Sequence, residues 1–105
     1  MWWLRDRFDR ASLPAGRTVV QVNLAAPDRR YWLLLQPESI DVCRTDPGYE
    51  VDLTLTAPTA ELFRVVQGWQ PLDRALRDGL LTLVGPSGVT RDFARWFSSP
   101  FAVVG

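Results

Sequence analysis

Apolar and polar residues alternate with a period of two through the first half of the chain. In residues 18–25, Val20, Val22 and Leu24 fall on one side, and Gln21 and Asn23 fall on the other. Successive side chains of a strand point to opposite faces, so this segment is predicted to be a half-buried strand. Residues 29–37 are apolar on both faces, which is typical of a strand in the interior of a covered sheet.

Residues 39–58 are predicted to form a β-hairpin. The turn would lie at residues 46–49, where Pro47 suits the second turn position and Gly48 a positive φ. Pairing Thr45 with Glu50 would set the register. One apolar face would then hold Ile40, Val42, Val51, Leu53 and Leu55.

After residue 57 the apolar spacing changes to that of helices. Prolines begin and glycines end two short predicted helices, at residues 58–68 and 71–79. A short strand at residues 80–85 and a last helix at residues 86–97 follow, the helix carrying an apolar stripe.

The N-terminal segment, residues 1–16, is predicted to be a short amphipathic connecting helix, because Leu4 and Phe8 fall on one side. Residues 17–105 would form one domain. Strands that come mostly first and helices that come mostly later predict an α+β fold. We expect about five strands in a mainly antiparallel sheet, with the helices packed on one face.

Two stretches resemble a known family. The segment "VQGWQPLDRALRDGLLTLVGPSGVTRDFARWF" resembles the closing part of the sterol carrier protein fold in the order and type of its elements. The segment "YWLLLQPESIDVCRTDPGYEVDLTLTA" resembles the sterol carrier-like C-terminal domain of some HxlR-type winged-helix transcriptional regulators, through the residues Asp41-Val42-Cys43, Asp46-Pro47-Gly48 and Glu50-Val51-Asp52-Leu53. The resemblance covers residues 17–101, and those regulators carry a winged helix before this domain.

The resemblance implies a cavity between sheet and helices that takes a lipid, sterol, acyl chain or similar apolar molecule. The chain would then be the non-catalytic, effector-sensing part of a bacterial transcriptional regulator. The same apolar spacing is also expected of an ordinary packed core, so both interpretations stay open. The candidate lining residues are Val22, Leu33, Leu35, Val42, Leu53, Leu55, Phe63, Val66, Leu76, Leu83, Phe93 and Phe97.

Charge and composition exclude several classes of function. Twelve basic residues, all of them arginine, balance 12 acidic ones, so no positive field favours direct contact with nucleic acid. The absence of lysine suggests GC-rich coding. Cys43 is the only cysteine and histidine is absent, which excludes an intrachain disulfide and the usual zinc sites, and no cofactor is expected. The longest apolar run is too short to span a bilayer, and a cytoplasmic location is predicted.

No residue set suggests an enzyme. Without histidine a serine or cysteine nucleophile lacks its commonest base, and Cys43 lies in mid-strand. In the predicted hairpin Asp41 and Asp52 share a face and could be imagined as an acid–base pair, but solvation of that face explains them better. Residues 85–88 could offer backbone N–H groups to an anion, yet they lack the lysine of a phosphate-binding loop.

Tryptophan is abundant, and Trp2, Trp3 and Trp32 are the candidate interface residues. Trp32 should lie on the sheet face opposite Leu33. Either the N-terminal helix covers it, or the rings form an exposed docking face. The second alternative makes the chain an interaction or dimerisation module with a filled core, whose partner is a second copy or a winged-helix domain.

Overall fold

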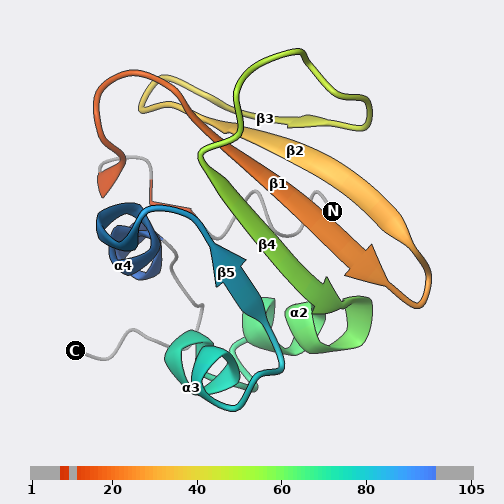
Figure 1. The fold of residues 1–105 in the computed structure, drawn as a ribbon. Coiled ribbons are helices and arrows are strands. Elements are labelled where there is room, and N and C mark those ends of the chain that lie inside the picture. Colours follow the sequence, from red (N-terminus) through yellow and green to blue (C-terminus); the bar gives the residue numbers. More distant parts are fainter. Residues whose placement is uncertain (1–7, 10–11, 97–105) are drawn as a thin grey trace.

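The computed structural model describes residues 8, 9 and 12–96. The predictions for Trp2, Trp3, Leu4 and Phe97 therefore lie outside the described residues. The elements are labelled in Figure 1. They are β1 (Thr18–Ala25), β2 (Arg29–Leu35), β3 (Ile40–Cys43), β4 (Leu53–Pro58), α2 (Thr59–Val66), α3 (Leu72–Arg77), β5 (Thr82–Val84) and α4 (Ser87–Trp96).

The strands form one five-stranded sheet in the order β3-β2-β1-β4-β5. β1 pairs with β4 in parallel, and the other neighbours are antiparallel. The predicted α+β fold with a mainly antiparallel sheet is confirmed. β2 is an interior strand as predicted, while β1 occupies the middle of the sheet.

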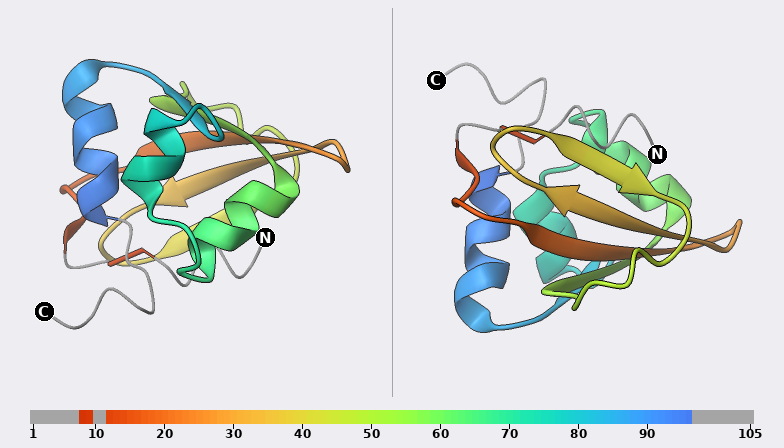
Figure 2. Two further views of the ribbon diagram at one scale, coloured as in Figure 1. Left: turned by 90° about the horizontal axis from the view of Figure 1, so that it is seen from below. Right: turned by 90° about the horizontal axis from the view of Figure 1, so that it is seen from above.

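The predicted hairpin of residues 39–58 is wrong. β3 and β4 lie on opposite sides of the β1–β2 pair, and residues 44–52 join them by crossing the sheet face opposite the helices (Figures 1 and 2). The local turn signal is real, because Gly48 has a φ of 85° and its N–H donates to Asp46 Oδ1. That turn does not decide which strands pair: β4 aligns instead with β1, Leu53 beside Val20.

The core lies between the sheet and the three described helices, which all cover one face (Figure 2). Alternate residues of the strands point to this face, as the period of two predicted. The residues that fill the layer are Val20, Val22, Leu24, Leu33, Leu35, Ile40, Leu53, Leu55 and Ala57 from the sheet and Phe8, Leu13, Leu62, Val65, Val66, Ala75, Leu81, Phe93 and Trp96 from outside it.

α2 ends in a Schellman motif, which explains an exposed aromatic pair. Gly68 has a φ of 81°, and its N–H and that of Trp69 donate to Val65 O and Arg64 O. An apolar contact commonly accompanies this motif, and here the rings of Phe63 and Trp69 meet edge to face with centroids 6.0 Å apart. Phe63 is 37% exposed and lies outside the core layer, because α2 turns its neighbours toward the sheet.

The structure bears differently on two predictions, one for the N-terminal segment and one for Trp32. Phe8 forms an isolated β-bridge, and Asp9 N–H donates to Trp96 O at 2.7 Å. These two residues are therefore not helical, while residues 1–7 and 10–11 of the predicted helix lie outside the described part. Trp32 does lie on the face opposite Leu33, and it is only 8% exposed, so little of its indole is available to a partner.

Candidate functional site

A shallow, solvent-open groove with a mainly apolar lining lies between α3, β5 and α4. We call it the β5 groove; it has a volume of about 420 Å³. Two of the predicted ligand-binding residues, Leu76 and Leu83, line it and also pack against the core layer. Its lining residues are Leu76, Gly79, Leu81, Thr82, Leu83, Thr90 and Arg91.

The β5 groove combines an apolar floor with a polar rim. Its floor is leucine, whereas Thr82 and Arg91 at the rim are exposed. Thr90 donates its hydroxyl proton to Ser87 O, and no ion pair of Arg91 is found among the described residues. Such a groove suits the apolar part of an amphiphile, since small-molecule sites are mostly apolar with a few polar groups.

The other predicted ligand-binding residues differ in how deeply they are buried. Val42 is partly buried against the core, Phe63 is exposed on α2, and Phe97 lies outside the described residues. The remaining seven are at most 2% exposed and fill the layer between sheet and helices: Val22, Leu33, Leu35, Leu53, Leu55, Val66 and Phe93.

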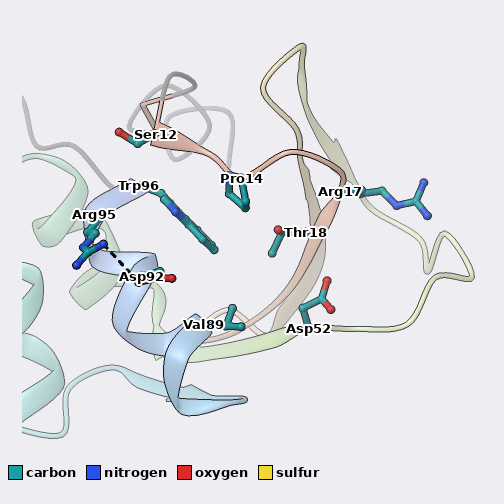
Figure 3. A pocket seen from close by; sticks show the side chains of 9 residues that line it. All are labelled: Ser12, Pro14, Arg17, Thr18, Asp52, Val89, Asp92, Arg95 and Trp96. Carbon is teal, nitrogen blue, oxygen red and sulfur yellow. Dashed lines mark ion pairs between the residues drawn. The ribbon is translucent and has the colours of Figure 1, made fainter.

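A second groove, which we call the α4 groove, lies on the other side of α4 (Figure 3). Its volume is about 600 Å³, and its walls are α4, the segment that leads into β1 and the residue that precedes β4. Its lining residues are Ser12, Pro14, Arg17, Thr18, Asp52, Val89, Asp92, Arg95 and Trp96.

Hydrogen bonds fix one wall of the α4 groove. Asp52 Oδ2 accepts the N–H of Val19 at 2.8 Å, and Val19 O accepts the N–H of Asp52 at 2.9 Å. On the opposite wall Asp92 Oδ1 lies 3.8 Å from Arg95 Nη1 in an exposed ion pair. Such an exposed pair contributes little to stability.

The α4 groove was not predicted from the sequence. A partial signal existed on α4, because Val89, Asp92 and Trp96 follow a helical spacing of three and four residues. The other wall depends on the parallel pairing of β4 with β1, which brings Asp52 beside Val19. The hairpin prediction placed Asp52 near Asp41 instead. In the structure Asp41 lies on β3, Asp52 precedes β4, and β2 and β1 lie between these two strands.

The described residues contain neither a metal-binding cluster nor a membrane-spanning helix. Among these residues, no group of three or more histidine, cysteine, aspartate or glutamate side chains could hold a metal ion. The longest helix of this part of the chain, α4, has 10 residues, and none is suited to crossing a bilayer.

Comparison with known proteins gives a family and a set of similar folds. The family model described as the SCP-2 sterol transfer family matches residues 5–98. No curated protein sequence matches the chain. A UbiJ-SCP2 ubiquinone synthesis protein is 24% identical with a TM-score of 0.64, over 83% of this chain and 72% of that one. Sterol carrier protein 2-like 2 from Aedes aegypti is 16% identical with a TM-score of 0.60, over 83% and 80%.

A larger protein contains a similar fold. The inverting sec-alkylsulfatase Pisa1 from a Pseudomonas species is 16% identical with a TM-score of 0.68 over 91% of this chain. The chain spans only 15% of the length of that enzyme. These identities are low, so the similarities to solved structures establish the fold and carry no activity over to this chain.

Proposed function

Because the chain belongs to the SCP-2 sterol transfer family, we propose that it binds an apolar small molecule or lipid without catalysis, between the sheet and the helices. The observation that supports this most is the β5 groove, whose floor residues Leu76 and Leu83 are continuous with the buried layer. The groove would be the mouth of the site. A polar end of the ligand would remain at the rim beside Arg91.

The elements around this mouth are short enough to move apart. α3 has 6 residues and β5 has 3, and β5 is an edge strand. Elements with few buried contacts open at the lowest cost in free energy. Because Leu55 pairs with Leu83, displacement of β5 would expose Leu55 and extend the groove into the core layer.

A regulatory setting is part of the proposal. In it, residues 17–105 are the effector-sensing domain of a bacterial, cytoplasmic transcriptional regulator, and residues 1–16 connect it to a winged helix that contacts the DNA. The support is the resemblance of residues 31–57 to the C-terminal domains of HxlR-type regulators. A reading frame that encodes a winged helix upstream of Met1 is the expected finding, and a frame without any DNA-binding domain would contradict this setting.

Replacement of Leu83 by glutamine should weaken the binding of a fluorescent fatty acid to delipidated protein by about tenfold or more. The change places a polar amide on the groove floor, and burying a leucine side chain contributes about 1.5–3 kcal/mol. Titration of the fluorescent probe gives the affinity.

Val84→Gln is the matched control, because Val84 is the next residue of β5 and is 62% exposed. Its affinity should equal that of the unaltered protein. The proposal fails if the protein binds no displaceable probe and no lipid co-purifies with it by native mass spectrometry. If Leu83→Gln binds the probe with normal affinity, the ligand does not enter its site through the β5 groove.

A further inference from the structure

The indole N–H of Trp32 is buried without a hydrogen-bond partner. Trp32 is 8% exposed, and among the described residues its Nε1 is the buried side-chain polar atom that lacks a partner. An indole nitrogen can only donate, so the missing partner is an acceptor. Native structures contain few unpaired buried donors, because leaving one unpaired is unfavourable. This N–H therefore indicates an acceptor that the described part of the chain does not supply.

A shallow, solvent-open groove borders Trp32 at the end of the β1–β2 pair. We call it the turn groove; its volume is about 450 Å³. Asn23 pairs with Arg30, and Trp32 follows two residues later on β2, so these three side chains lie on the same face of the sheet. The lining residues are Asn23, Leu24, Asp28, Arg29, Arg30 and Trp32.

The turn groove presents more donors than acceptors. Asn23 Oδ1 accepts a hydrogen bond from Gln21 Nε2 at 3.0 Å, which orients the Asn23 amide and leaves its two N–H donors. Arg29 Nη1 donates to Asp28 O at 2.9 Å, which holds this guanidinium group at the turn. Arg29 and Arg30 are exposed, and neither has an ion pair with any described residue.

The charge of the lining is positive. Arg29 and Arg30 outnumber Asp28, which is the only acidic residue of the lining and is exposed. An anion at this place would therefore meet two guanidinium groups and one carboxylate. A cation would meet the opposite balance, and the indole N–H could not bind it.

The turn between β1 and β2 is held in one conformation. Ala26 has a φ of 57°, in the left-handed region that residues with a Cβ rarely occupy. The Thr59 hydroxyl, at the first residue of α2, donates to Ala25 O at 3.1 Å and lies 3.5 Å from Pro27 O, so it contacts the turn on both sides of Ala26 (Figure 1). Backbone strain of this kind persists where surrounding contacts maintain it, and it is frequent at ligand sites.

We propose that the turn groove binds a phosphate group. The guanidinium groups of Arg29 and Arg30 match the oxygens of a phosphate, and Asn23 and the Trp32 N–H would donate to the same group. Because Trp32 Nε1 is covered in this structure, we expect the exposed side chain of Arg30, its neighbour on the same face, to swing outward as the phosphate enters. This site is additional to the proposed lipid site, because the turn groove and the β5 groove share no lining residue.

The direct test follows the indole N–H of Trp32 by proton–nitrogen correlation NMR while the full chain is titrated with phenyl phosphate. The Trp32→Phe variant identifies this signal by its loss. We expect the Trp32 signal to shift downfield with half-saturation at or below about 1 mM, and benzoate to need at least about fivefold more, because a carboxylate offers fewer oxygens to the four donor groups. No shift with about 10 mM phenyl phosphate, or an equal shift with benzyl alcohol, would overturn the proposal.

A second titration distinguishes a soluble phosphate ester from a lipid headgroup. Dihexanoyl phosphatidic acid, kept below its micelle concentration, carries the same group on a lipid. If it shifts the Trp32 signal at lower concentration than phenyl phosphate does, the site takes a lipid headgroup, and the reverse order indicates a soluble ester. Binding of neither compound would overturn the proposal.

Variants then locate the site. Arg29→Gln combined with Arg30→Gln removes both charges at exposed positions, and the concentration of phenyl phosphate at half-saturation should rise about tenfold or more. Asp28→Asn removes the competing carboxylate and should lower it about twofold. Trp32→Phe removes the N–H and keeps an aromatic ring, and calorimetry should show an affinity about fivefold weaker.

Arg64→Gln combined with Arg74→Gln is the control, because it removes two exposed arginines of α2 and α3 that do not line the turn groove. This variant should bind phenyl phosphate normally. Unchanged affinity in the Arg29 and Arg30 double variant, with folding verified by circular dichroism, would place the phosphate elsewhere and overturn the assignment. Fatty acid binding measured in the same samples reports separately on the lipid site.

Discussion

Replacement of Gly85 by alanine is expected to lower the free energy of unfolding by about 2–3 kcal/mol, as overpacking of a close contact does. A Cβ at this position would lie 2.6 Å from Leu53 Cδ2 and 2.7 Å from Asp52 O. The Leu53 side chain could rotate at some cost, but the carbonyl of Asp52 belongs to the backbone. Relief of the clash therefore requires the chain after β5 to move away from the start of β4.

Thermal and urea unfolding would measure this loss. For a domain of this size, a loss of 2–3 kcal/mol corresponds to a decrease in Tm of roughly 10–20 °C. Gly88→Ala is the control: the Cβ would meet only Arg91 Nη2 at 3.8 Å, inside α4, where alanine favours the helix over glycine by up to about 1 kcal/mol. If Gly85→Ala unfolds at the same temperature as Gly88→Ala, the close approach of Gly85 to β4 is not maintained in solution.

The sequence predicted the elements far better than their pairing. The two-residue alternation in residues 18–25 identified β1 with its bounds, and the glycines at 68 and 79 do end helices with positive φ values. These are local signals, determined by side-chain alternation and turn geometry. The strand that pairs with β4 is decided by long-range contacts. The same alternation of apolar and polar residues in β4 suits both a parallel neighbour and a hairpin neighbour, so the alternation could not distinguish the two.

The residues of the two grooves also differ in whether a local sequence signal could identify them. Leu76 and Leu83 were predicted as ligand-binding residues because both lie on apolar faces, and both line the β5 groove. Thr18 and Asp52 of the α4 groove are 34 positions apart and look like ordinary strand-end polar residues in the sequence. They meet only because residues 44–52 cross the sheet and deliver β4 to β1.

The buried layer raises the question of which leucines stabilise the fold and which would contact a ligand. Seven of the predicted ligand-binding residues are at most 2% exposed, which is the packing expected of a core. Leu83 is only partly buried and lines a groove, so it can contact a ligand without prior rearrangement. Leu55, its neighbour on β4, can do so only if β5 moves.

Leu55→Ala is expected to lower the free energy of unfolding by about 3 kcal/mol, within the 2–5 kcal/mol that truncation of a buried leucine costs. Leu55 is 1% exposed and lies between Val22 of β1 and Leu83 of β5, so the cavity could not collapse without disturbing two neighbouring strands. Urea unfolding measures the loss. Thr56→Ala, on the exposed face of the same strand, should lose less than about 1 kcal/mol.

The same Leu55 variant also separates core from ligand contact. If Leu55 only packs in the core, the delipidated variant shows the whole loss of about 3 kcal/mol in its free energy of unfolding. The fluorescent fatty acid then binds within about threefold of its normal affinity, because the groove at Leu83 is intact. If Leu55 instead lines an occupied site, the stability loss falls toward the transfer term alone, about 1–2 kcal/mol, and probe affinity falls with it. The first result would keep the ligand at the β5 groove, and the second would show that β5 moves aside to admit it into the layer.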